Sequence, residues 1–190
     1  MPGQSRRSFL KTATGCAALA VLPSPAFAQS KPLATSVIDL HGERRLYIKV
    51  QHSGEIFDGT FRNDVFANTG ALAQIDILMR DWRRDEVVQI DRSLIDLLAN
   101  VQSQIGYHEP LTLISCYRSR KTNEMLRRRS RAVAKNSYHV KGMAVDLRID
   151  GVSTKKLRNI SRPFKAGGIG YYPRKNFVHL DTGPLRSWVG

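Results

Sequence analysis

Apolar residues recur along the chain with two different periods, and these periods predict its elements. Over residues 69–82, and again from Asp91 to Ile105, they return every three or four positions, as on one face of an α-helix. Asp91 is a suitable N-cap for the second helix, and Gly106 closes it. Shorter helices are expected over residues 122–129 and 154–160.

Runs rich in β-branched and aromatic residues predict the strands. The runs RLYIKV (45–50) and EIFDGTF (55–61) flank the turn HSG and indicate a β-hairpin. Further strands are predicted over LTLISCY (111–117), from residue 143 to 149, and over FVHLD (177–181), with a glycine-rich turn leading into IGYYP (169–173). This order predicts an α+β fold: one domain with a central antiparallel sheet flanked by helices.

The first 28 residues have the pattern of a bacterial export signal. SRRSFLK (5–11) is followed by the apolar run AALAVL (17–22) and by PAFA, which ends at Ala28. Twin arginines, a short apolar core and a small-residue cleavage site predict a twin-arginine signal peptide over residues 1–28 and a periplasmic location. Residues 29–35 are then a leader and residues 36–190 the domain. The apolar run is too short to span a membrane, so no stable insertion is expected after cleavage.

The charge of the chain favours anionic partners. The full sequence carries +14, and cleavage after Ala28 removes three of 30 basic residues and none of 16 acidic ones, leaving +11. Such a charge attracts polyanions, which for an exported protein are cell-wall polymers, peptide carboxylates and lipid headgroups rather than nucleic acid. The densest basic run, RRRSR (127–131), has the character of a solvated helix face. The one mature cysteine, Cys116, is predicted to be a buried strand residue.

Asp146 stands in the middle of a strand in which apolar and other residues alternate. The alternation from Met143 to Ile149 puts Asp146 on the face opposite the apolar set, where a carboxylate needs a partner. His139 and His179 together with Asp146 would supply two imidazoles and one carboxylate, the ligand types of a catalytic zinc site with an open position for water. Manganese, iron or cobalt would also accept this set. The remaining histidines, 41, 52 and 108, are predicted to be surface or loop residues.

Several stretches resemble a known family. SYHVKGMAVDLR (137–148) has the form S-x-H-x-x-G-x-A-x-D and resembles the zinc-ligand motif of the M15 peptidases, the D-alanyl-D-alanine peptidase and murein endopeptidase group. ISCYRSRKTNEMLRRRS (114–130) and GGIGYYPRKNFVHLDTGPLRSW (167–188) are similar to its periplasmic murein endopeptidase K branch. The resemblance implies an M15/hedgehog-like fold and one zinc ion held by His139, Asp146 and His179.

The same resemblance implies an activity. It predicts a zinc metallopeptidase that hydrolyses the peptide cross-links of peptidoglycan, and its branch points to links that join two diaminopimelate residues. It also places Arg118 near the zinc, where a guanidinium can clamp a substrate carboxylate or stabilise an oxyanion. Two positions depart from the family pattern: Cys116 stands where glycine is more frequent, and Tyr138 where leucine is frequent.

Asp181 has two interpretations that the sequence leaves open. No glutamate occurs after Glu124, and Asp181 shares a strand face with His179, about 7 Å along it. It is either the general base or the group that holds the outer nitrogen of His179. The sequence also suggests weaker candidates for the pocket, namely Ser115, Ser137, Tyr138, Arg148, Tyr171 and Tyr172.

Competing functions remain at this point. A D,D-carboxypeptidase that trims a terminal D-alanine would use the same site. A zinc-containing module that binds the cell wall without turnover would keep the ligands and the basic surface. A nucleic-acid-binding protein explains the charge but neither the signal nor the ligands. The sequence does not indicate the oligomeric state.

Overall fold

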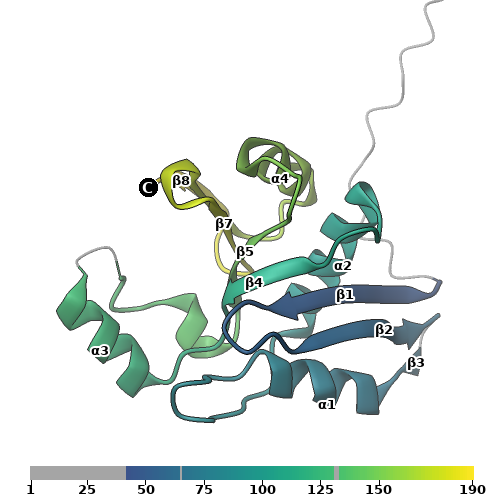
Figure 1. Ribbon diagram of the computed structural model, residues 1–190, viewed down its shortest axis with the longest axis horizontal. Coiled ribbons are helices and arrows are strands. Elements are labelled where there is room, and N and C mark those ends of the chain that lie inside the picture. Colours follow the sequence, from purple (N-terminus) through teal and green to yellow (C-terminus); the bar gives the residue numbers. More distant parts are fainter. Residues whose placement is uncertain (1–41, 65, 131–132) are drawn as a thin grey trace, which may run out of the picture. The chain divides into compact units, whose positions relative to one another are not determined.

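The computed structural model describes residues 42–64, 66–130 and 133–190, which lie within a unit spanning Thr35–Gly190. The predicted signal peptide and leader, and His41, fall outside the described residues. Within these ranges eight strands form one sheet in the order β3-β2-β1-β4-β5-β7-β6-β8 (Figure 1). The strands are β1 (Arg44–Val50), β2 (Ile56–Asn63), β3 (Phe66–Ala67), β4 (Leu111–Ser115), β5 (Ala144–Arg148), β6 (Gly168–Tyr172), β7 (Phe177–Asp181) and β8 (Arg186–Val189).

Four α-helices accompany the sheet in the described part of the chain, which confirms the α+β prediction. They are α1 (Thr69–Leu78), α2 (Arg92–Ile105), α3 (Arg120–Arg129) and α4 (Thr154–Ser161), with short 3-10 turns η1 (Tyr138–Lys141), η2 (Arg162–Phe164) and η3 (Pro173–Lys175). The side chain of Asp91 caps α2, as predicted, by accepting a hydrogen bond from the Ser93 backbone.

The sheet is mixed rather than wholly antiparallel. β1 and β2 form the predicted hairpin, and β5 pairs antiparallel with both β4 and β7. However, β1 runs parallel to β4, and β6 runs parallel to β8. Both parallel pairs join strands that are distant in sequence or separated by a crossover. The alternation of apolar and polar residues within a strand does not indicate which other strand it pairs with.

The hydrophobic core lies between one face of the sheet and the helices. α1 contacts β2, α2 contacts β1, and α4 contacts β6 and β7. The core side chains of the central strands are fully buried, among them Leu46, Ile48, Val145, Leu147, Val178 and Leu180. Burial of each such side chain contributes about 1.5–3 kcal/mol. The apolar set of β5 and β7 thus faces the helices, and the residues between them face the other way.

The clearest differences from the sequence prediction are the end of one helix and two additional strands. α1 ends at Leu78 rather than near Trp82, because Met79 leaves the helical conformation and the chain turns there. Trp82 is therefore not a core residue: it is 46% exposed and stacks on His52 at 4.5 Å between ring centroids. Strands β3 and β8 were not predicted, since both are short and mostly exposed.

Candidate metal centre

His139 is held in place by backbone geometry near the end of β4. It lies in η1, which ends at Gly142 in the left-handed conformation (φ 68°) that glycine adopts readily. Its Nδ1 lies 2.7 Å from the carbonyl oxygen of Cys116, and the residue is only 2% exposed. Because a carbonyl oxygen can only accept, Nδ1 carries the proton, and Nε2 presents a lone pair to the site.

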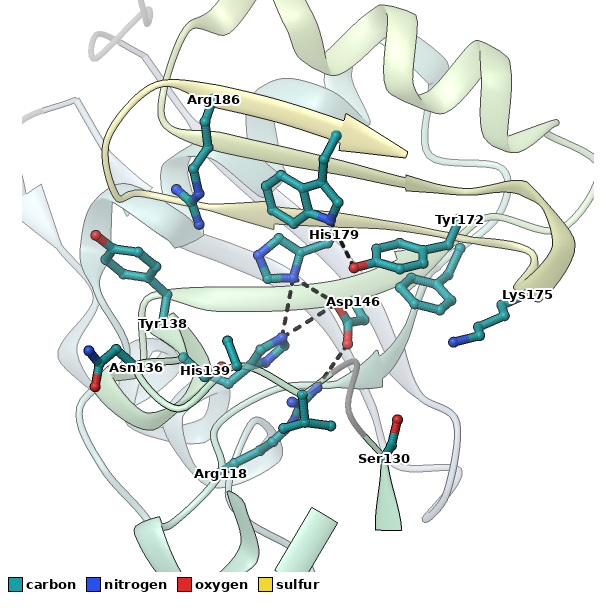
Figure 2. Close-up of a pocket in the computed structure, with 15 residues that line it drawn as sticks. Arg118, Ser130, Asn136, Tyr138, His139, Asp146, Tyr172, Lys175, His179 and Arg186 are labelled. Carbon is teal, nitrogen blue, oxygen red and sulfur yellow. Dashed lines mark hydrogen bonds and ion pairs between the residues drawn. The ribbon is translucent and has the colours of Figure 1, made fainter. Parts of the chain in front are cut away.

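Asp146 and His179 meet because their strands pair in register. They are directly opposite each other across the antiparallel β5–β7 ladder, on the face away from the helices. The Oδ1 atom of Asp146 lies 2.8 Å from Nδ1 of His179. The Nε2 atom of His139 lies 3.4 Å from the same oxygen and 3.3 Å from the same nitrogen. Figure 2 shows the three side chains converging from η1, β5 and β7.

The carboxylate of Asp181 is hydrogen-bonded to the other ring nitrogen of His179. Its Oδ2 lies 2.8 Å from Nε2 of His179, so this nitrogen donates its proton to the carboxylate and leaves Nδ1 free to present a lone pair. Asp181 is fully buried and also accepts hydrogen bonds from the backbone of Gly168 and Gly183. Two guanidinium nitrogens of Arg186 lie 3.0 and 2.6 Å from its oxygens.

The donor atoms of the site fit a metal ion. Three atoms, one from each of His139, Asp146 and His179, all lie within 4.8 Å of one another. Ligand atoms about 2.0–2.1 Å from a tetrahedral zinc ion are separated by about 3.3 Å, which is close to the contacts in this site. Both imidazole protons are engaged elsewhere, so two lone pairs face a carboxylate oxygen. Within the described ranges, no other group of three or more His, Cys, Asp or Glu residues has this geometry.

The pKa values of the three groups respond to this arrangement. Burial lowers the pKa of His139. Burial acts in the same direction at His179, but hydrogen bonds to Asp146 and Asp181 outweigh it and raise the pKa of that imidazole. Burial opposes ionisation of Asp146, yet the neighbouring imidazoles hold its pKa well below its usual range. The carboxylate is therefore ionised, and a proton on His179 or a cation can relieve the repulsion among the acceptors.

Arg118 supports the carboxylate of Asp146. Its Nη2 donates to Oδ2 of Asp146 at 2.9 Å, and its Nε donates to the hydroxyl of Ser115 at 2.8 Å. Its backbone N–H donates to the carbonyl of His139. Burial lowers the pKa of Arg118, although the Asp146 charge acts against this. The guanidinium thus binds the oxygen of Asp146 that does not face the histidines.

The site opens into a pocket of about 370 Å³. Aromatic side chains line one side of it. Trp188 of β8 lies 5.3 Å from His179 between ring centroids and donates from Nε1 to the hydroxyl of Tyr172 at 2.8 Å. Tyr172 stacks on Phe177 at 4.4 Å. Gly170 makes room for this wall, since a Cβ at that position would lie 2.6 Å from the Trp188 ring.

The weaker sequence candidates fall in different places. Ser137, Tyr138 and Tyr172 line the pocket, and Ser115 contacts Arg118. Arg148 does not line it: its side chain binds Gln51 and pairs with Asp150 at 3.5 Å. Tyr171 lies under Arg158 of α4 on the helical side of the sheet. Cys116 is buried, and burial raises the pKa of its thiol, as expected of a structural residue.

Several residues that line the pocket were absent from the sequence-based site, and three of them lie in β8 and η3. Arg186 and Trp188 come from β8, which was not predicted, and Lys175 comes from the η3 turn. The family-like stretch 167–188 contains all three, so it was the one available signal. Figure 2 shows Lys175 at the edge of the pocket beside Tyr172.

An α+β domain in which two imidazoles and a carboxylate converge on an open pocket has the donor set found in proteins with a single-ion metal site of the catalytic type. Comparison with known proteins specifies the family. A model of the M15 peptidase family described as peptidoglycan L,D-endopeptidase MepK matches residues 40–188, and the chain belongs to this family.

Curated relatives cover nearly the whole chain. The peptidoglycan L,D-endopeptidase MepK of Escherichia coli (strain K12) is 39% identical over 184 residues, which is 97% of both proteins. The probable peptidoglycan L,D-endopeptidase MepK of Haemophilus influenzae is 36% identical over 188 residues, covering 98% of this chain and 97% of the relative. In the described part of the chain, no helix has the length and apolarity to cross a membrane.

Proposed function

We propose that this protein is a zinc-dependent endopeptidase that hydrolyses peptide cross-links of peptidoglycan. The observation that carries the proposal is the convergence of His139, Asp146 and His179, whose outward nitrogens and oxygen are already bound by protein groups. Membership of the M15 peptidase family and the endopeptidase activity named for the relatives support the proposed reaction and substrate.

His139, Asp146 and His179 would hold the ion through Nε2, Oδ1 and Nδ1. When bound, zinc polarises a carbonyl and lowers the pKa of water, the two requirements of peptide hydrolysis at neutral pH. The protein's contribution is orientation. The Cys116 carbonyl fixes the ring of His139, and Arg118 keeps one oxygen of Asp146 turned away from the histidines. Hydrogen bonds of this kind set the tautomer and direction of metal ligands.

Of its two interpretations, we assign Asp181 to positioning His179. Both its oxygens already accept hydrogen bonds, from the imidazole, two backbone amides and Arg186. Burial opposes its ionisation, but these donors hold the pKa of Asp181 well below its usual range. A fully buried carboxylate with so low a pKa is a poor proton acceptor at neutral pH, because a general base works best with a pKa near the ambient pH.

We further propose that the bond cleaved is the link between two diaminopimelate residues. The open pocket suits an endopeptidase because a cross-link continues on both sides of the scissile bond. Arg118 and Lys175 place positive charge at the pocket, which suits the free carboxylates of peptide stems. A D,D-carboxypeptidase would need only the terminal residue.

Digestion of purified, cross-linked sacculi by the zinc-loaded protein tests this function. Mass spectrometry of the released peptides should show dimers linked through two diaminopimelates converted to monomers, and a chelator should block the conversion. Loss of terminal D-alanine alone would establish the carboxypeptidase instead. Binding to sacculi without any cleavage would establish the wall-binding module.

We also propose that residues 1–28 direct export by the twin-arginine pathway to the periplasm, where this substrate lies. The periplasmic form should begin at Gln29, as determined by N-terminal sequencing. Replacing Arg6 and Arg7 by lysine should retain the precursor in the cytoplasm. Unchanged export of that variant would contradict the assignment.

A further inference from the structure

A second cavity of about 480 Å³ lies beside the metal-site pocket. One wall is a single face of α3, formed by Arg120, Asn123, Glu124 and Arg127, which recur at helical spacing. The other wall is the segment 135–141, which leads into and includes η1. Asn136 and Ser137 line both hollows, so the two are adjacent. The segment that presents His139 to the metal site therefore also forms this second cavity.

The cavity is strongly cationic. Arg120, Arg127, Lys135 and Lys141 line it, against the single carboxylate of Glu124. All five side chains belong to exposed residues, and within the described residues none of them forms an ion pair. Four cations around one hollow repel each other and favour an anion there. The two arginines that follow Arg127 also belong to exposed residues but do not line the cavity.

Asn123 adds a second, independent feature to the cavity. It is only 3% exposed, and its Nδ2 donates to the carbonyl of Ala134 at 3.1 Å. This bond fixes the amide, so Oδ1 is the remaining polar atom. Oδ1 is buried and accepts no hydrogen bond from the described residues. A buried acceptor without a donor is unfavourable, and a ligand with an N–H group would satisfy it.

We propose that this cavity is a subsite for an acidic peptide, which binds its carboxylates to the four cations and donates a backbone N–H to Asn123. The inference rests on the proposed function: one peptide of the cross-link crosses Asn136 and Ser137 from the metal site and continues into the cavity. A phosphodiester polymer offers oxygen acceptors but no N–H donor for Asn123. Glu124 repels a phosphate and a peptide carboxylate alike, so the preference for a peptide rests on the N–H donor that Asn123 requires.

The test is calorimetric binding of a synthetic stem peptide with free carboxylates, compared with the same peptide after amidation. The protein is first treated with a chelator, so that the peptide is not hydrolysed during the measurement. The chelator should leave the cavity unchanged, because none of the proposed metal ligands lines it. The acidic peptide should bind roughly tenfold more tightly than the amidated one, since several charge contacts are lost together. The difference should shrink in high salt, which screens exposed charges.

Matched variants locate the effect. Replacing Arg127 and Lys135 together by glutamine should weaken the acidic peptide roughly three- to tenfold and leave the amidated one unchanged. Glu124→Gln should strengthen the acidic peptide about twofold, a gain that misfolding cannot produce. Lys155→Gln with Lys156→Gln removes the same charge from exposed positions on α4, which packs on β6 and β7, and should have no such effect.

Equal binding of the two peptides, or an equal loss in the α4 variant, would overturn the subsite. Its failure is distinguishable from failure of the proposed function. If sacculi are cut normally but the two peptides bind equally, the endopeptidase function stands and the subsite is overturned. If sacculi stay uncut but the acidic peptide still binds more tightly than the amidated one, the subsite stands and the endopeptidase function is overturned.

Discussion

Asp76 and Asp146 are two buried carboxylates, each bound to an arginine, in different regions of the molecule. Asp76, on α1, accepts two hydrogen bonds from Arg92 at 2.7 Å and one from the backbone of Ile90 at 3.0 Å. Asp146, on the sheet, accepts from Arg118 through one oxygen only. Its other oxygen faces Nε2 of His139, whose ring proton is on Nδ1, and Nδ1 of His179, which can donate to it only when that imidazole is protonated. The first carboxylate is surrounded by donors, and the second is directed at acceptors.

The difference separates a structural role from a functional one. Asp76 ties α1 to the start of α2 and needs no further partner. At Asp146 the arrangement costs stability unless a cation or a proton joins the acceptors. Such a local conflict persists only where the surrounding structure enforces it, and here the β5–β7 register and the bonds of His139 and His179 do so.

The largest effect is expected when the acceptor cluster is broken. Asp146→Asn should lower zinc affinity by at least about a thousandfold and abolish hydrolysis, because losing a ligand exceeds the 10–100-fold cost of losing a ligand's outer partner. Zinc should raise the unfolding temperature of the wild type but not of this variant. Metal content, measured by plasma mass spectrometry, and thermal unfolding with and without chelator check this.

Asp76→Asn is the matched control, since it changes a buried carboxylate paired with arginine in the other region. It should retain the zinc-dependent rise in unfolding temperature. Full zinc binding by Asp146→Asn would remove the basis for assigning the metal to this cluster.

A smaller loss is expected at Asp181, which contacts the proposed ligand His179 and is not itself a proposed ligand. Asp181→Asn should reduce zinc affinity about 10–100-fold, because the ring of His179 loses the carboxylate that fixes its tautomer. Hydrolysis should return at saturating zinc. Zinc titration followed by activity measurement at full occupancy makes the distinction. Activity that stays abolished at full occupancy would identify Asp181 as the general base.

On the structural side of the comparison, Asp76→Asn should lower the free energy of unfolding by about 2–3 kcal/mol. Breaking a buried ion pair costs about 3–5 kcal/mol, and solvent access to Arg92 reduces this figure. Urea unfolding of the chelated protein measures the loss. An unchanged unfolding midpoint would show that the α1–α2 contact depends on apolar packing alone.

Much of the fold and the site was predictable from local sequence. The alternation around Asp146 and in FVHLD assigned those side chains to the face opposite the core, and the structure places them there. Helix α2 follows its apolar spacing and its Asp91 cap, and α4 lies where a short helix was predicted. The resemblance to the M15 peptidases selected His139, Asp146 and His179, which the structure brings together. Their binding of a metal stays a prediction.

The remaining features depend on contacts that local patterns do not encode. That Asp146 lies opposite His179 follows from the register of β5 and β7, which long-range packing determines. Arg186 reaches Asp181 from β8, a strand of four mostly exposed residues without an apolar alternation. Arg118 was predicted to clamp a substrate carboxylate or stabilise an oxyanion, and this role stays a prediction. Its hydrogen bond to Asp146 was not predicted, because this contact depends on the pairing of β4 with β5.

The smallest effect concerns a third carboxylate, Asp81, which like Asp76 meets only donors. It is buried and accepts from the backbone of Ser119 at 2.9 Å and of Arg83 at 3.1 Å. Burial opposes its ionisation, but hydrogen bonds from Thr122 and Ser119 hold the pKa of Asp81 below its usual range. Its folded-state pKa lies below the unfolded value of about 3.9, so its stabilisation is present above that pH and is lost as the pH falls through the folded pKa.

Asp81→Asn should therefore lower the unfolding free energy by about 1–2 kcal/mol at neutral pH, because the hydrogen bonds that Asp81 accepts become weaker when the charged acceptor is replaced by a neutral one. The difference from the wild type should shrink as the solution is acidified below the unfolded pKa, because the wild-type carboxyl then becomes neutral as well. Urea unfolding of both chelated proteins over this pH range measures it. A difference that stays constant with pH would mean that Asp81 stabilises the fold through its shape rather than its charge. Hydrogen-bond donors around a buried carboxylate would then not be sufficient evidence that its charge stabilises this protein.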